Sequence, residues 1–415
     1  RQYVLLAASI LFYLTYGVRM AGYLAATILL TYLFGLWLDR LAAFRPAAET
    51  KEERKRQKRA NDRKKRRVLA LSLVLNFASL ALLKYGGFLA AAVNSVLGTE
   101  LPLPHFLLPL GISFYIFQTS AYLIDISRGK HRAERSFLRY ALFVCYFPQL
   151  VQGPINRFAD LQPQLTEGND FSWDNIQHGF LRMLYGVLKK AMIADTLAPI
   201  VAKIYGGYAA YPGIICFLGA ALYCIQLYCD FSGGIDLMMG ISRLFGISMQ
   251  ENFCRPYFSV SLSDFWRRWH ITLSGWFRDY IYIPLGGNRK GAARQLFNMF
   301  LVWAATGIWH GASWNFVFWG IYYGLLLLAE KFLLGRFLEK APVWLRNLYT
   351  MFAVIIGWVF FSQTTPAAIG KMLGAMFGLG ASCFADRASL YALKSGLILM
   401  IISVISCRPG LYQYF

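Results

Sequence analysis

The chain has 415 residues, of which 57% are hydrophobic, 17% aromatic and only 15% charged. Because soluble domains carry roughly 25% charged residues, this composition excludes an ordinary water-soluble enzyme. The net charge is +21, but the cations are gathered in short segments between apolar blocks. We therefore expect a lipid bilayer around the protein and no nucleic-acid partner.

Long apolar blocks follow one another along the whole chain. A helix needs about 20 mostly apolar residues to cross a hydrocarbon core of about 30 Å, and many of the blocks approach that length. We predict an all-α polytopic integral membrane protein, a single membrane domain over 1–415 with about 10–12 transmembrane or re-entrant helices. The blocks are 3–17, 20–38, 68–97, 106–125, 136–152, 212–229, 230–247, 296–309, 313–334, 346–362 and 389–406.

The densest charge lies in segment 44–67, which contains KEERKRQKRANDRKKRR at 51–67. It separates two apolar blocks, so the positive-inside tendency predicts a basic cytoplasmic loop. Block 68–97 should carry the chain outward and block 106–125 should bring it back, so the next loop should again be cytoplasmic. That loop, 128–135, is basic, as this orientation requires. Segment 44–67 is either a patch for anionic lipid or an acidic partner, or a topology determinant on a solvated helix or loop, and we expect the second.

The seven cysteines are scattered and form no CxxC pair. We expect small buried hydrophobic residues here, with no metal site and no disulfide.

Polar groups interrupt the apolar pattern from residue 251 onward. Ser261 and Asp264 have the spacing of a helix start. Apolar side chains then recur every three or four residues up to Tyr280, which predicts one amphipathic helix. His270 falls near the boundary of its two faces, and the polar face carries Arg267, Ser274 and Arg278. Such a helix suits a membrane interface or a polar cavity.

The next apolar segment carries a single ionisable residue, His310. An ionisable side chain inside a membrane segment is a functional candidate, because its charged form is costly there. His310 is therefore expected to be neutral and able to accept a proton. If the helix starts near Arg294, His310 lies roughly 24 Å along it, past the midplane and toward the outside. The alternative is a histidine hydrogen-bonded between helices.

Several motifs in order resemble the membrane-bound O-acyltransferase family, in particular its bacterial branch, to which the membrane subunit of alginate O-acetylation belongs. They cover most of residues 70–330, and 251–320 holds the signature core. The motifs are PLGISFYIFQ at 109–118, FPQLVQGPI at 147–155, LKKAMIAD at 188–195, YCDFSGGIDLMMGISRLFGI at 228–247, DFWRRWHITLS at 264–274, RDYIYIPLGGNR at 278–289 and GIWHGASWNFVFWG at 307–320. This chain departs from the family at Gly234 and Ile235, which weakens inference about the acceptor.

The resemblance implies that His310 is the catalytic residue and that His270 is a second important position. His310 would be the general base. His270 either orients the donor or a neighbouring group, or is a satisfied interfacial histidine.

Basic residues near the two histidines are candidates for binding the phosphates of the donor. These are Arg267, Arg268 and Arg278, whereas Arg289 and Lys290 are expected to be positive-inside anchors. Trp309, Trp314 and Asn315 are candidate tunnel or oxyanion residues, with packing the expected role of the two tryptophans. Asp230 and Asp236 lie in or beside an apolar block and should pair with a basic residue whose identity the sequence does not give.

The implied activity is transfer of an acyl group, expected to be acetyl, from a cytoplasmic thioester to hydroxyls of an extracytoplasmic polysaccharide or its partner transferase. The donor would be acetyl-CoA or an acyl-carrier thioester, with no bound cofactor. The expected location is the cell (cytoplasmic) membrane, with a central tunnel joining its two sides. The expected partners are a cell-envelope polysaccharide and an extracytoplasmic acetyl-transfer protein.

Three alternatives stay open. One is D-alanyl transfer to teichoic acid from a carrier protein, although the RDYIYIPLGGNR stretch favours acetyl transfer. The others are a transporter or flippase of a lipid-linked sugar, and a noncatalytic scaffold. A transporter typically shows internal repeats and polar residues spread over several helices, whereas here the polar signal is concentrated in one stretch.

Overall fold

The computed structural model is all-α, and its described part contains no β-strand. It describes residues 1–47, 49–102, 106–167, 171–379, 383–391, 393, 394, 401, 405 and 407. The chain divides into two compact units, residues 1–175 with 242–250, and residues 176–241 with 251–415. The predicted all-α class is therefore confirmed. The predicted block at 389–406 lies mostly outside the described residues.

The first unit is built around three helices, α2, α3 and α4, that pack on one another. Buried polar contacts join them, since Asn76 on α3 donates hydrogen bonds to Thr119 and Ser120 on α4, each at 2.9 Å. Its helices are α1(Gln2–Leu14), α2(Val18–Ala42), α3(Lys51–Leu97), α4(Ile112–Ser127), α5(Phe137–Cys145), α6(Phe147–Leu150) and α7(Phe158–Thr166).

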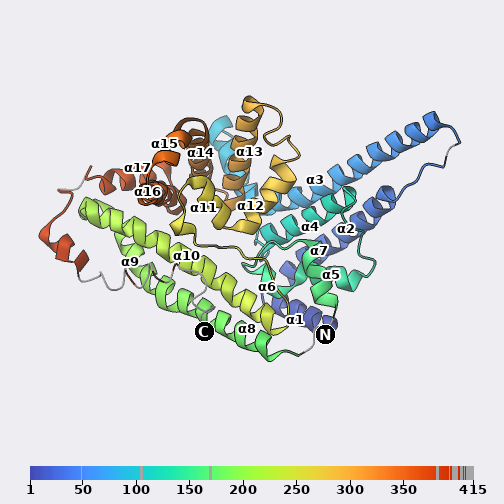
Figure 1. Cartoon of the computed structure of the whole chain (residues 1–415), viewed down its shortest axis with the longest axis horizontal. Helices are drawn as coiled ribbons and strands as arrows, with labels where there is room; N and C mark the ends of the chain where they lie inside the picture. The colour runs from blue at the N-terminus through green and yellow to red at the C-terminus, as the bar shows by residue number, and fades with distance from the viewer. Residues whose placement is uncertain are drawn as a thin grey trace. The chain divides into compact units, whose positions relative to one another are not determined.

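The basic segment is helical from Lys51 onward, so of the two forms expected for it, a helix or a loop, most of its length adopts the helix. Thr50 caps the helix by accepting a hydrogen bond from the Glu53 N–H at 3.2 Å. Asn61 donates to the Leu41 carbonyl at 2.8 Å, which ties the basic helix to the end of α2. Figure 1 shows this end of α3 continuing the apolar part without a break. Arg, Lys and Glu are good helix formers, so charge did not stop the helix.

The second unit contains all of the predicted signature core. Its elements are α8(Trp173–Val187), η1(Leu188–Ala194), α9(Asp195–Gly206), η2(Tyr208–Ala210), α10(Gly213–Leu244), η3(Pro256–Phe258), α11(Leu262–Arg268), α12(Ile271–Phe277), η4(Arg278–Tyr282), α13(Ala292–His310), α14(Trp314–Ala329), η5(Glu330–Leu334), α15(Gly335–Lys340), α16(Val343–Ser362) and α17(Pro366–Met376). The α8 helix begins just before the unit boundary.

Two apolar blocks that were expected to be separate helices, 212–229 and 230–247, form the single helix α10. The polar interruption between them is Asp230, and it is paired with Lys190 at 2.9 Å. Both side chains of this pair are partly exposed, so the helix continues through Asp230 without burying a charge. The prediction that Asp230 and Asp236 pair with basic residues is confirmed.

Five helices are long and apolar enough to cross a membrane, among the residues that the structure describes. They are Val18–Ala42, Lys51–Leu97, Gly213–Leu244, Trp314–Lys340 and Val343–Ser362. Apart from block 389–406, the remaining predicted blocks form shorter helices. The protein is therefore a multi-pass membrane protein. Its described residues hold fewer full-length spans than the number of helices predicted, because that number included re-entrant helices and divided α10.

Helices α13 and α14 form a close-packed hairpin in the second unit. A Cβ atom on Gly307 would overlap the carbonyl oxygen of Phe316, and one on Gly320 would lie 2.5 Å from the Trp303 carbonyl oxygen. Two glycines facing each other thus allow the backbones to touch, as small residues do between membrane helices. This contact fixes the end of α13, where His310 lies.

Candidate active site

The segment expected to be one amphipathic helix is broken at His270, so that prediction is wrong. Its start is as predicted, because Ser261 accepts a hydrogen bond from the Asp264 N–H at 3.0 Å. Helix α11 then ends at Arg268, and α12 begins at Ile271. His270 between them has φ 47 and ψ 54, the left-handed region that few side chains adopt.

The break arises from an extended segment at 252–254 that binds the chain on both sides of His270. Phe253 and Trp269 form an antiparallel bridge. The Cys254 N–H donates to the Arg268 carbonyl at 2.9 Å. The Ile271 N–H donates to the Asn252 carbonyl at 3.0 Å. These bonds replace helical ones, so periodicity alone could not show the break.

His310 is the last residue of α13, and Gly311 ends the helix in an extended conformation. Aromatic rings surround the half-buried imidazole: its centroid lies 4.9 Å from that of Trp319 and 5.3 Å from that of Phe361. The ring of Trp309 is 4.9 Å away. Such a setting holds the imidazole by packing in an apolar surrounding.

His270 and His310 line the same cavity of about 200 Å³. One wall comes from the α11–α12 segment and η4, and the other comes from α13. The lining residues are Trp266, Trp269, His270, Leu273, Ser274, Phe277, Arg278, Tyr282, Met299, Val302, Trp303, Thr306 and His310. Aromatic rings and a few polar side chains that converge on a cavity are the usual features of a small-molecule site.

The His270 ring is almost fully buried, with 2% of the residue exposed. Its segment lies outside the five candidate membrane spans. Burial lowers the pKa of His270 to about 3, because the charged form loses its hydration. His270 is therefore a neutral imidazole at physiological pH.

Among the predicted donor-binding arginines, only Arg278 lines the cavity. Its Nε atom donates to Asp279 Oδ1 at 2.9 Å, and most of its side chain is exposed. Arg268 pairs with Asp264 at 2.8 Å, within α11. Arg267 is exposed and is not among the lining residues. The structure therefore brings one of the three to the histidines.

The predicted tunnel or oxyanion residues do not line the cavity. Trp309 packs behind it, with its ring centroid 6.0 Å from that of His270. Trp314 is 53% exposed. Asn315 donates to the carbonyl of Phe361 at 3.0 Å, so its amide group binds the end of α16. Packing and helix capping account for these contacts.

Three polar groups at the site were not predicted. Thr306 lies one helical turn before His310 on α13, so the i, i+4 spacing was a signal that could have found it. Tyr282 lies in η4, in the motif at 278–289. Asn252, which binds His270 from outside the cavity lining, gave no signal, because only the fold brings it there.

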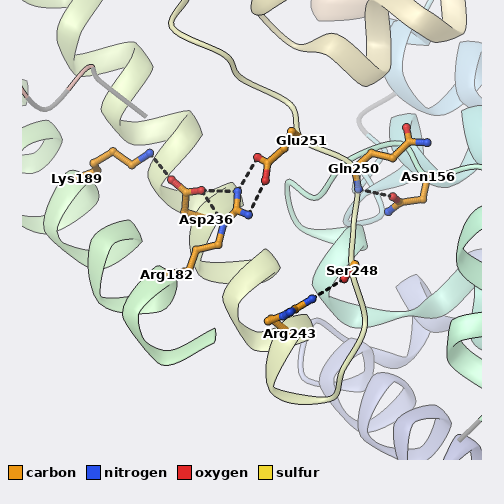
Figure 2. A network of polar contacts seen from close by, with 8 residues as sticks. All are labelled: Asn156, Arg182, Lys189, Asp236, Arg243, Ser248, Gln250 and Glu251. Carbon is orange, nitrogen blue, oxygen red and sulfur yellow. Dashed lines mark hydrogen bonds and ion pairs between the residues drawn. The ribbon is translucent and has the colours of Figure 1, made fainter. Parts of the chain in front are cut away.

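A cluster of charges lies beside this segment, in the same unit. Asp236 is buried between Arg182, at 2.8 Å, and Lys189, and Arg182 also forms two hydrogen bonds with Glu251, at 2.6 and 2.7 Å. Figure 2 shows the Arg182 guanidinium between the two carboxylates. The cluster therefore anchors the start of the extended segment to α8 and α10.

No group of three or more His, Cys, Asp or Glu side chains in the described ranges could hold a metal ion. The two histidines line one aromatic cavity, and imidazole is the side chain that most often serves as a general acid or base.

The membrane-bound O-acyltransferase family model matches residues 127–369, which include the whole cavity. The chain belongs to this family. As a member, it is an O-acyltransferase of the membrane.

Curated relatives match more than half of the chain. A probable alginate O-acetylase from Azotobacter vinelandii is 35% identical over 100% of this chain and 80% of its own length. A peptidoglycan O-acetyltransferase from Helicobacter pylori is 33% identical, over 90% of this chain and 73% of its own. A teichoic acid D-alanyltransferase from Bacillus subtilis is 28% identical, over 55% of this chain and 60% of its own length.

Proposed function

We propose that this O-acyltransferase moves an acetyl group from a cytoplasmic thioester to hydroxyls of an extracytoplasmic polysaccharide, or to a partner protein that modifies it. The observation that carries this proposal is the convergence of His270 and His310 on one aromatic cavity. The two O-acetylases and their match over nearly the whole chain support the acetyl group and the glycan acceptor.

In this proposal His310 is the general base. It takes the proton of the acceptor hydroxyl as the oxygen attacks the thioester carbonyl. The new C–O bond forms, the C–S bond breaks, and the leaving thiolate receives the proton from His310. An aromatic surrounding that holds the ring in place suits this role, because a positioned base contributes roughly 10²–10⁴-fold to the rate.

The volume of the cavity favours a short acyl group. A dry cavity of about 150 Å³ is large enough for benzene, and this one has about 200 Å³. An acetyl group with the adjoining thioester fits such a volume. The larger parts of both substrates then stay outside the cavity.

We assign the donor side to Arg278, which is exposed and lines the cavity. Its guanidinium suits a phosphate of coenzyme A or of an acyl-carrier arm. In this arrangement the protein lies in the cytoplasmic membrane, and a tunnel carries the acetyl group outward. An extracytoplasmic acetyl-transfer protein would then receive it or assist its transfer.

The test uses purified protein in detergent with radiolabelled acetyl-CoA and soluble alginate or peptidoglycan fragments. We expect label to appear on the glycan, and His310→Ala to reduce the transfer to background. If acetyl-CoA is inert and a D-alanyl-loaded carrier protein supports transfer, the transferred group is D-alanyl and not acetyl. Transfer at the wild-type rate in His310→Ala would contradict the proposal and favour a scaffold.

A further inference from the structure

The side chain of Asn252 collects three contacts at one atom. Its Oδ1 lies 3.0 Å from the Thr272 N–H, 2.8 Å from Thr272 Oγ1 and 3.3 Å from His270 Nδ1. Asn252 and His270 are both fully buried, at 0% and 2% exposed. A buried acceptor with several partners is held in one orientation.

These contacts determine which atoms carry hydrogen. The Thr272 backbone N–H can only donate, so the atom that faces it must be the amide oxygen of Asn252 and not its nitrogen. That oxygen has no hydrogen to give. His270 Nδ1 must therefore be the protonated nitrogen, because two lone pairs facing each other in a buried place would repel.

The other ring nitrogen of His270 is then a bare acceptor. A neutral imidazole carries one hydrogen, and here Nδ1 holds it. His270 Nε2 is buried and has no hydrogen-bond partner within the described residues. His270 lines the cavity, and a group of a bound molecule that reached Nε2 would satisfy this otherwise costly buried acceptor.

Asn252 is itself held by its neighbour in sequence. Glu251 accepts two hydrogen bonds from Arg182, which is bound to Asp236 on α10. Figure 2 shows this connection from Asp236 through Arg182 to Glu251. The backbone of Asn252 also accepts from the Ile271 N–H at 3.0 Å. The residue is therefore fixed from both sides.

We propose that Asn252 is a positioning residue that holds His270 in the Nδ1–H tautomer, so that Nε2 accepts a hydrogen bond from substrate in the cavity. The catalytic consequence rests on the proposed function, but the tautomer does not. With its only hydrogen given to Asn252, neutral His270 cannot donate to an oxyanion. It binds a substrate group that carries hydrogen, which is the acceptor hydroxyl or an amide N–H of the thioester's pantetheine arm.

The first experiment reads the tautomer directly. Protein labelled with ¹⁵N-histidine is placed in nanodiscs, and His270→Gln assigns the signals by NMR. We expect protonated Nδ1 and bare Nε2 in the wild type, and at least partial transfer of the hydrogen to Nε2 in Asn252→Leu. Asn298→Leu is the matched control, since Asn298 is also buried but donates to the Gly287 carbonyl at 3.0 Å. It should leave the His270 signals unchanged.

The second experiment separates positioning from a merely structural role. Asn252→Asp keeps an oxygen acceptor, whereas Asn252→Leu removes it. The carboxylate raises the pKa of His270, because a negative charge favours the imidazolium. At low pH, His270 then becomes protonated and Nε2 loses its lone pair. The activity of Asn252→Asp should therefore be near that of the wild type above neutral pH. On the acid side, the variant should lose activity at a higher pH than the wild type does.

Asn252→Leu should lose about tenfold or more in rate at every pH, as expected for loss of a hydrogen bond that holds a catalytic group. The other ionisable groups that share the cavity, Arg278, Tyr282 and His310, are unchanged in all variants. A rise in the KM of the thioester places the bound N–H on the donor. A fall in kcat with unchanged donor KM places the bound O–H on the acceptor.

Two results would overturn the proposal. One is a wild-type His270 that carries its hydrogen on Nε2. The other is an Asn252→Asp enzyme as inactive as Asn252→Leu at every pH while both remain folded. Failure of acetyl transfer in the wild type would refute the proposed function and leave the NMR result intact.

Discussion

The two walls of the cavity are built in different ways. His310 lies at the end of a regular helix whose position is fixed by close packing against the next helix along the chain. His270 lies in a break between two short helices, and residues 252–254 create that break. The first wall depends on local sequence and glycine contacts, and the second depends on hydrogen bonds to a separate segment.

This difference indicates a division of labour. The base that must meet a hydroxyl is packed among aromatic rings, as the rings of Trp319 and Phe361 around His310 show. A neutral histidine whose hydrogen must be on one nitrogen needs a specific polar partner, and Asn252 supplies it. Variants that damage one wall and spare the other test the comparison.

The largest effect is expected from removing the histidines. His310→Gln should lower the rate by about 10²–10⁴-fold, because glutamine cannot take up a proton. His270→Gln should lower it by less, because it removes the ring nitrogen that accepts a hydrogen bond from substrate. The measurement is acetyl transfer by purified protein. If the two residues act as a unit, the double variant will be no slower than His310→Gln. Losses that multiply fully would show independent roles.

The next effect concerns the anchor of the second wall. Arg182→Leu leaves the buried Asp236 with one of its two cations and should destabilise the protein by about 3–5 kcal/mol. Thermal unfolding in detergent measures this loss of stability. A thiol-reactive dye follows the unfolding, because the thiol of Cys224 is buried in the folded protein and becomes exposed. Arg243→Leu is the control, since Arg243 is half-buried and binds exposed partners, Ser248 at 2.9 Å and Asp174 at 3.7 Å. Equal unfolding temperatures for Arg182→Leu and Arg243→Leu would contradict the prediction.

The first wall should be sensitive to added volume. Gly307→Ala forces the α13–α14 contact apart and should cost about 1–3 kcal/mol, with a fall in activity because His310 shifts. Gly275→Ala is the matched change in the second wall, where an added Cβ meets nothing within 4 Å. It should be neutral or stabilise by up to about 1 kcal/mol, as alanine favours a helix. Thermal unfolding and transfer rates measure both.

The smallest effect is expected at a helix start. Ser261→Ala removes the cap of α11 and should lower stability by about 1 kcal/mol. Thr365→Ala removes the equivalent cap of α17, where Thr365 accepts from the Ala368 N–H at 3.2 Å. We expect similar unfolding temperatures for the two variants but a reduced transfer rate only for Ser261→Ala. Equal activities would show that α11 does not transmit its position to His270.

Several parts of the fold were predictable because their causes are local. The helix start at Ser261 follows from a side chain that reaches three residues along the chain. The helix that ends at His310 follows from apolar composition, and its glycine ends it. Two continuities were not predicted: that of the basic segment with the apolar part of α3, and that of the two apolar blocks in α10. Helix continuity depends on pairing and capping that the apolar pattern does not encode.

The sequence by itself determined that the protein is all-α, belongs in a membrane and carries a histidine in an apolar helix. These follow from hydrophobicity and from the ordered motifs. Only the tertiary structure placed His270 and His310 in one cavity and brought Asn252 to the His270 ring. It also showed that Arg278 lines this cavity, whereas Arg267 and Arg268 do not. The physical reason is that composition and hydrophobic periodicity describe neighbours along the chain. The hydrogen bond between His270 and Asn252, which are 18 residues apart, forms only when the fold brings them together.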